Sequence, residues 1–341
     1  MTNDEHYMTG IGLSQYVYGA ERLGLPAKEI LRECGLDPDV ALQPTQRIPH
    51  RQYETFLLQL ILLSGDEYLG FHIGHQVMPA LYGALPALAF SAANGRQALE
   101  MGLRYQALAA GTVEGFAASE QDGGLLFTWS MVHQNPVMRR HVTDNVFTLI
   151  ANILRFITGQ PETAAQTVTL EYAPPAAEQQ QAMAALFGCP VRFAASANQI
   201  MLGPELLGAP LNVHNTEQLG IAEEQARKQL AGQQQTQDWL AQVRRQMQDL
   251  MAARSPRREI VADRLNVSMR TLDRRLAEAG LTWQQLLDGM RAQLAREYLA
   301  DPSLNIQTVS ARLGFADVRA FQRRFRVWTG TTPSDYRNRL G

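Results

Sequence analysis

The chain has 341 residues, the length of about two domains at roughly 150 residues each. Hydrophobic residues make up 45% of it and charged residues 19%, a composition that excludes an intrinsically disordered protein. No run of about 18 consecutive apolar residues occurs, so the sequence predicts no membrane-spanning helix.

The net charge of −2 conceals a strong asymmetry along the chain. Residues 240–341 contain 18 arginines, no lysine and 10 acidic side chains, a formal charge of +8. Residues 1–239 carry a formal charge of −10. A general preference for arginine codons explains the scarcity of lysine but not the opposite signs. The basic last third is typical of a module that binds a polyanion such as nucleic acid.

Signals of compartment and of bound cofactors are few. The first residues are acidic and polar, which is not the pattern of a secretory signal. Two cysteines, Cys34 and Cys189, are too few for a disulfide framework and too isolated for a structural zinc site. We therefore expect a cytoplasmic protein that holds no metal and no other cofactor.

The first 230 residues combine helical and strand patterns. Apolar spacing predicts helices at residues 12–32, 53–63, 96–110 and 138–157. Alternating patterns predict strands at residues 112–117, 125–131, 167–172 and 199–202. Asp122-Gly123-Gly124 between the first two strands has the composition of a hairpin turn. The mixture predicts an α+β domain at residues 1–230.

A glutamine-rich stretch follows this domain. The helical pattern of residues 216–230 gives way to a polar run, which we interpret as a flexible linker at residues 231–239. A new helix is then expected, because Trp239, Val243 and Met247 recur at intervals of four residues. An all-α domain is predicted at residues 240–339.

Residues 257–279 have the pattern of a helix-turn-helix unit. Buried positions recur at helical spacing: Ile260, Val261, Leu265, Leu272 and Leu276. Ser268 is expected to cap the second helix and Gly280 to end it. With 3.6 residues per turn, three polar side chains share the exposed face of the second helix: Arg270, Asp273 and Arg274.

The pattern occurs again at residues 305–328, where Asp317 is expected to cap the second helix. The expected core positions are Ile306, Val309, Leu313, Val318, Phe321, Phe325 and Trp328. The exposed face carries Arg319, Gln322, Arg323 and Arg326. A long helix between the two units is expected to begin at Thr282, with Gln285 completing a capping box, and to stop at Asp301-Pro302.

A longer motif ends the chain. It joins a glycine-phenylalanine turn, two phenylalanines four residues apart, a later glycine and a Pro-x-x-Tyr-Arg ending: Gly314, Phe315, Phe321, Phe325, Gly330, Pro333, Tyr336 and Arg337. With this motif, residues 240–339 resemble the DNA-binding domain of the AraC/XylS family of bacterial transcription regulators. The resemblance implies seven helices and two helix-turn-helix units separated by the long helix.

Two recognition helices on one domain can enter successive major grooves, about 34 Å apart. The resemblance implies that these residues read bases: Arg270, Asp273, Arg274, Arg319, Gln322 and Arg323. Arginine suits guanine, glutamine suits adenine, and aspartate accepts only from cytosine. Asp273 has the alternative role of orienting Arg270 or Arg274. Contacts to phosphates, or to the fold itself, are expected from Arg264, Arg275, Arg324 and Arg326.

The first part of the chain also carries a resemblance. Its supporting stretches are residues 47–49, 65–74, 98–100, 187–193 and 198–200. With them, residues 19–216 resemble the arabinose-binding-like sensor domain of an AraC subgroup that includes regulators of ornithine use and of virulence. This implies a domain that dimerises and binds a small molecule differing between members. Candidates for its pocket are Arg104, Tyr105 and Trp129.

Together these observations predict a sequence-specific transcription regulator, an activator, with promoter DNA, RNA polymerase, a small effector and a second copy of the chain as partners. The alternative is a ligand-independent regulator controlled by a protein partner or by its abundance. An alkyl-transfer repair enzyme with a DNA-binding tail is not expected, because neither cysteine is followed by the histidine of its acceptor motif.

Overall fold

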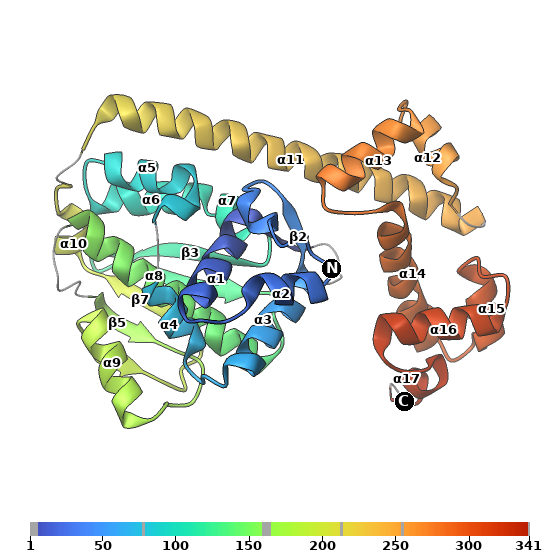
Figure 1. The fold of residues 1–341 in the computed structure, drawn as a ribbon, viewed down its shortest axis with the longest axis horizontal. Coiled ribbons are helices and arrows are strands. Elements are labelled where there is room, and N and C mark those ends of the chain that lie inside the picture. Colours follow the sequence, from blue (N-terminus) through green and yellow to red (C-terminus); the bar gives the residue numbers. More distant parts are fainter. Residues whose placement is uncertain (1–5, 77–78, 159–164, 212–213, 254–255, 340–341) are drawn as a thin grey trace. The chain divides into compact units, whose positions relative to one another are not determined.

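The computed structural model describes residues 6–76, 79–158, 165–211, 214–253 and 256–339. The chain divides into two compact units, which meet between Gly232 and Gln233 and are described separately (Figure 1). The first unit is a mixed α/β domain and the second is helical, as the sequence predicted. Of the helices described, none combines the length and apolar character needed to cross a membrane.

A five-stranded sheet forms the middle of the N-terminal unit (Figure 1). Its spatial order is β3 (Glu114–Gln121), β4 (Gly124–Met131), β7 (Asn198–Leu202), β5 (Ala165–Thr169) and β6 (Val191–Arg192). Among the strand pairs of the described residues in this sheet, β5–β6 is parallel and the others are antiparallel. The predicted hairpin is confirmed: Asp122 and Gly123 both have positive φ, 51° and 76°, as a two-residue type I′ turn requires.

Helices surround this sheet. They are α1 (Gly10–Arg22), α2 (Ala27–Glu33), α3 (His50–Ser64), α4 (Leu69–His75), α5 (Ala84–Ser91), α6 (Gly95–Tyr105), α7 (Ala107–Ala110), α8 (Pro136–Thr158), α9 (Ala177–Phe187) and α10 (Pro204–Gly208). Short 3₁₀ turns are η2 (Val40–Leu42) and η3 (Pro79–Tyr82), and a small sheet pairs β1 (Tyr7–Thr9) with β2 (Arg47–Pro49). Helices α4 and α8 pack so closely that a Cβ atom at Gly70 would lie 1.9 Å from the His141 carbonyl oxygen.

The prediction of a flexible linker at residues 231–239 is wrong. One helix, α11 (Thr216–Ala253), runs without a break through this stretch (Figure 1). Glutamine is a good helix former, and only Gly232 disfavours the helix, by about 1 kcal/mol. Packing on both sides compensates, because Ala226 is buried in the N-terminal unit and Leu240 in the C-terminal unit.

The C-terminal unit contains the last part of α11 and six further helices among the described residues. They are α12 (Arg258–Arg264), α13 (Met269–Glu278), α14 (Trp283–Ala300), α15 (Ile306–Arg312), α16 (Val318–Thr329) and α17 (Pro333–Asn338). The capping box of Thr282 and Gln285 is present at the start of α14, as predicted. One core prediction is wrong: Ile260 is 38% exposed, because α12 buries Val261 and Ala262 instead.

Candidate DNA interface and sensor cavity

The first helix-turn-helix unit presents α13. Ser268 Oγ accepts a hydrogen bond from the Thr271 amide (3.1 Å) at its start, and Gly280 follows its end with a φ of 72°. Leu272 and Leu276 are buried on its inner side. The opposite face is exposed and carries the three predicted side chains, Arg270, Asp273 and Arg274.

Two of these side chains have acidic or basic neighbours. Asp273 pairs with Arg258 of α12, with Oδ2 3.1 Å from Nη1, instead of orienting Arg270 or Arg274 as the sequence suggested. Arg274 pairs with Glu278 one turn further along α13, at 2.7 Å. Both pairs are about half exposed, so each contributes little to stability and is easily exchanged for another partner.

The second unit presents α16. Asp317 caps it by accepting a hydrogen bond from the Ala320 amide (2.7 Å), and Gly330 ends it with a φ of 74°. Phe321 and Phe325 are fully buried. The exposed face carries the predicted Arg319, Gln322 and Arg323, together with Arg326. Each unit therefore displays an arginine-bearing recognition helix.

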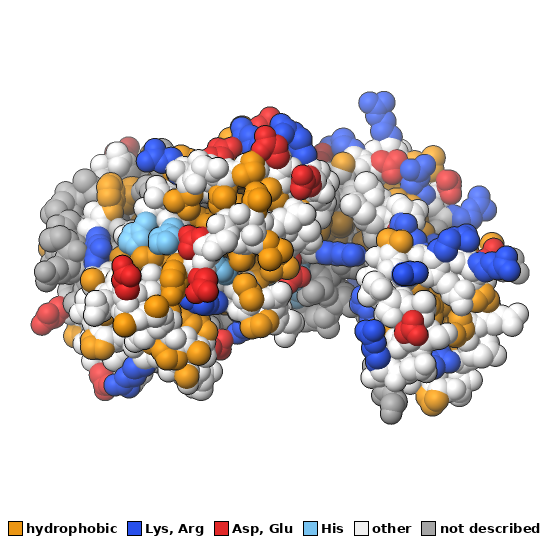
Figure 2. Space-filling view, turned by 60° about the horizontal axis from the view of Figure 1, so that its bottom comes forward, with side chains coloured by type: hydrophobic (Ala, Val, Ile, Leu, Met, Phe, Trp, Pro, Cys, Tyr) orange, Lys and Arg blue, Asp and Glu red, His pale blue; other side chains and the backbone are white. Residues whose placement is uncertain are grey.

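Of the four arginines expected at phosphates, one pairs with a buried acidic side chain and three are exposed. Arg324 forms an ion pair with the buried carboxylate of Asp288 in α14, so it holds the fold together. Arg275 lies over the ring of Trp239, 5.6 Å from its centre, and Arg264 bonds to Gln246 at 3.3 Å. Arg326 is exposed. Figure 2 shows the blue basic side chains gathered over the C-terminal unit.

A cavity of about 240 Å³ lies inside the N-terminal unit. Helices α1, α5, α6 and α8 and strands β3, β4 and β7 contribute side chains to its wall. Most of these are aliphatic or aromatic, including Leu99, Phe127 and Ile150. A concave, mainly apolar space with a few polar groups is typical of small-molecule sites.

The sequence placed three residues in the effector pocket, and the structure brings one of them to the cavity. Trp129 lines the cavity, and the centre of its ring is 4.5 Å from the centre of the Phe116 ring. Arg104 and Tyr105 are absent from the described lining, and both contact Glu223 of α11 instead, at 2.8 and 3.5 Å. Tyr82, which no sequence pattern distinguishes, also lines the cavity, from η3.

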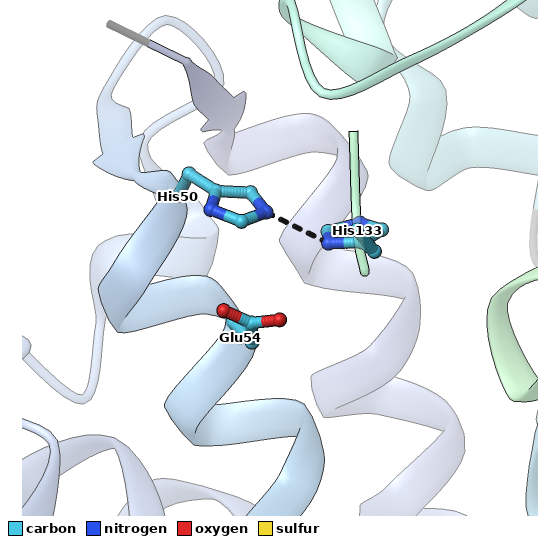
Figure 3. A group of neighbouring side chains, drawn as sticks. All are labelled: His50, Glu54 and His133. Carbon is cyan, nitrogen blue, oxygen red and sulfur yellow. Dashed lines mark hydrogen bonds between the residues drawn. The ribbon is translucent and has the colours of Figure 1, made fainter. Parts of the chain in front are cut away.

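A buried histidine pair lies beside this cavity and is drawn in Figure 3. His50 Nε2 is 2.8 Å from His133 Nδ1, and His133 Nε2 is 3.2 Å from Glu114, a lining residue. Glu54 lies one turn after His50 in α3. His50, Glu54 and His133 each offer one potential metal-ligand atom, and these three atoms lie within 4.8 Å of one another. Zinc accepts such donors. However, one proton on each Nε2 satisfies both hydrogen bonds, so the contacts are explained without an ion.

This pair makes the stability of the N-terminal unit dependent on pH. Burial, with the charge of His133 as a lesser cause, lowers the pKa of His50 to about 4. The unfolded chain binds a proton at His50 near pH 6.5, whereas the folded chain does so only near pH 4. Unfolding is therefore favoured increasingly as pH falls between these values, by about 2 kcal/mol at pH 5.

His141 adds to this effect, because burial lowers its pKa to about 4 as well. Asp144 opposes it, since burial raises the pKa of its carboxyl to about 7. We therefore expect His50→Gln to remove about 2 kcal/mol of the stability difference between pH 7.5 and pH 5. Urea unfolding of both proteins at the two pH values measures this. An unchanged difference in the variant would contradict a neutral His50.

Two helix-turn-helix units on a basic helical domain define a DNA-binding protein. Residues 24–211 match the family model for the N-terminal arabinose-binding domain of AraC transcription regulators, and residues 261–339 match a helix-turn-helix domain model. The chain belongs to the AraC family: it is a DNA-binding transcription regulator with an N-terminal sensor domain, and not an enzyme.

Several known proteins are similar over part or most of their length. The ornithine utilization regulator of Pseudomonas aeruginosa is 28% identical over 319 residues, which cover 92% of this chain and 91% of that protein. VirS of Mycobacterium tuberculosis is 30% identical over 192 residues, 55% of each chain. The crystal structure of CdpR from P. aeruginosa superposes with a TM-score of 0.44 at 22% identity, covering 92% of this chain and 96% of CdpR.

Proposed function

We propose that the protein activates transcription in response to a small molecule. Residues 1–230 bind the effector and dimerise, and residues 240–339 bind promoter DNA and contact RNA polymerase. The observation that carries this proposal is the combination, in one chain, of an apolar cavity and two exposed recognition helices.

In this proposal α13 and α16 enter successive major grooves. Arg270, Arg274, Arg319 and Arg323 read guanines, and Gln322 reads an adenine. Asp273 reads a cytosine only when it releases Arg258, its partner in the free protein. Arg326, Arg264 and Arg275 contact phosphates, whereas the pairing of Arg324 with Asp288 favours a structural role.

The effector acts by linkage. It shifts DNA binding or dimerisation only to the extent that it binds one arrangement of the protein more tightly than another. An effector at about 100 times its dissociation constant adds about 2.7 kcal/mol to the stability of the unit that binds it. A regulator controlled by a protein partner or by abundance would show no such stabilisation with any metabolite, and the cavity favours the first possibility.

Selection of bound fragments from a random DNA pool tests the DNA-binding part of the proposal. The full-length protein is used at about 150 mM salt, where non-specific binding is weakened. We expect a motif of about 17–20 base pairs with two conserved blocks one helical turn apart. Paired copies of the motif would support dimerisation. Recovery of fragments without any shared motif would contradict sequence-specific reading by α13 and α16.

A further inference from the structure

We propose that the cavity of the N-terminal unit takes an uncharged, mainly hydrocarbon molecule that carries at least one hydrogen-bond acceptor, such as a ketone or ester oxygen. Tyr16, Tyr82 and Trp129 offer it polar contacts. The inference rests on the proposed sensing function and adds to it the chemical class of the effector. It is carried by the wall of the cavity, by three unpartnered donors and by the distribution of charge.

The size of the cavity limits the ligand. A cavity of about 150 Å³ accommodates benzene, so 240 Å³ has room for a molecule of roughly ten non-hydrogen atoms. The wall is built mainly from aliphatic and aromatic side chains of α5, α6, α8 and the sheet, such as Leu85, Leu103 and Ile153. Transfer of a hydrocarbon ligand from water into this space is favourable.

Three donors in the wall require a partner: the hydroxyls of Tyr16 and Tyr82 and the indole nitrogen of Trp129. Tyr82 is 7% exposed and Trp129 is 6% exposed, and neither the Tyr82 hydroxyl nor the Trp129 indole nitrogen has a hydrogen-bond partner among the described residues. Buried polar groups are nearly always hydrogen-bonded. Indole nitrogen donates only, so the group that satisfies Trp129 is an acceptor.

Two other polar side chains of the wall are already engaged with the protein. Gln106 bonds to both backbone groups of Phe116, accepting from the amide (2.6 Å) and donating to the carbonyl oxygen (3.0 Å). Gln15 donates to Asn145. This leaves Tyr16, Tyr82 and Trp129, on α1, η3 and β4, as the polar anchor points open to a ligand.

Charge in the wall excludes an anion. Among the described lining residues, Glu114 alone is charged, and its Oε1 accepts bonds from Tyr53 (3.1 Å) and His133 (3.2 Å). A ligand carboxylate would be buried near this group without a lysine or arginine in the described wall to neutralise it, which is costly. A free amino acid, such as the ornithine in the name of one relative, is therefore disfavoured.

The test compares small probes on the full-length protein by titration calorimetry and thermal unfolding. The probes are 4-phenyl-2-butanone, the hydrocarbon butylbenzene, 4-phenylbutanoate and ornithine. We expect the ketone to bind most tightly, butylbenzene more weakly, and the two carboxylates not at all. Tyr82→Phe weakens ketone binding about three- to tenfold and leaves butylbenzene unchanged, because only the hydroxyl is lost. Trp129→Phe removes the indole donor and part of the apolar wall, so it weakens binding of both probes, and of the ketone more.

Tyr18→Phe is the matched control, since Tyr18 lies on α1 but outside the described lining of the cavity. Tighter binding of 4-phenylbutanoate or ornithine than of the ketone would overturn the proposed ligand class and leave the sensing function standing. Failure of all four probes to bind would overturn the ligand class too, and would favour control by a partner or by abundance. Equal binding of ketone and hydrocarbon, unaffected by both substitutions, would overturn the requirement for an acceptor, because water would then satisfy these donors.

Discussion

Phe325→Ala is expected to lower the free energy of unfolding of the C-terminal unit by about 3–5 kcal/mol. Phe325 lies on the inner side of α16 and is 0% exposed. Its ring contacts those of Phe321 and Tyr336, with centres 5.6 and 5.5 Å apart. Truncation loses these contacts and leaves a cavity that the surrounding helices fill only partly. The free energy of unfolding of a domain of this size is only about 5–15 kcal/mol, so much of the stability of the C-terminal unit depends on this side chain.

Denaturant unfolding of the full-length protein, followed by tryptophan fluorescence, measures the loss. Three of the four tryptophans, Trp239, Trp283 and Trp328, belong to the C-terminal unit and report on it. Val327→Ala is the matched control, because Val327 lies on the same helix and is 61% exposed. It should change stability by no more than about 0.5 kcal/mol. A Phe325→Ala protein as stable as the parent would refute the assignment of this face to the core.

The helix-turn-helix units could be predicted from the sequence because their signals are local. Ser268, Thr282 and Asp317 cap helices in the structure, each through a hydrogen bond to an amide three residues later. Gly280 and Gly330 occupy left-handed positions for which glycine is favoured. Helical periodicity is also a local property, and it determines which residues of α13 and α16 are exposed.

Features that depend on distant parts of the chain were missed. Strands β1 and β2 have three residues each and pair across about forty residues of sequence, so neither carries a readable pattern. The same holds for His50 and His133, whose contact joins α3 to the segment after β4. No spacing rule connects residues 83 positions apart.

The cavity of the N-terminal unit illustrates a second limit. Arg104 and Tyr105 are plausible ligand contacts by residue type, but their side of α6 faces α11, where Glu223 takes both side chains. Trp129 is a candidate on the same ground, its residue type, and it does line the cavity. Residue type therefore identifies groups able to bind a ligand, and only packing decides which of them reach the cavity.

The largest effect on DNA binding is expected from Arg274→Ala combined with Arg323→Ala. Each arginine, if it reads a guanine, contributes about 1–3 kcal/mol of discrimination at one base pair. The two side chains lie on different helices, α13 and α16, so their effects should add to about 2–6 kcal/mol. Arg274 must first break its exposed ion pair with Glu278, so we expect the effect of Arg274→Ala alone at the lower end of the range for one arginine.

Binding to the selected DNA motif, and to versions with one block altered, measures both effects at about 150 mM salt. Each single variant should lose discrimination in a different block, and the double variant in both. Arg326→Ala is the matched control on α16: it should weaken binding to every sequence equally and reduce the salt dependence by about one phosphate contact. If Arg274→Ala and Arg323→Ala behaved as this control does, both would be phosphate contacts. Sequence reading would then fall to Arg270, Arg319 and Gln322 on the same exposed faces.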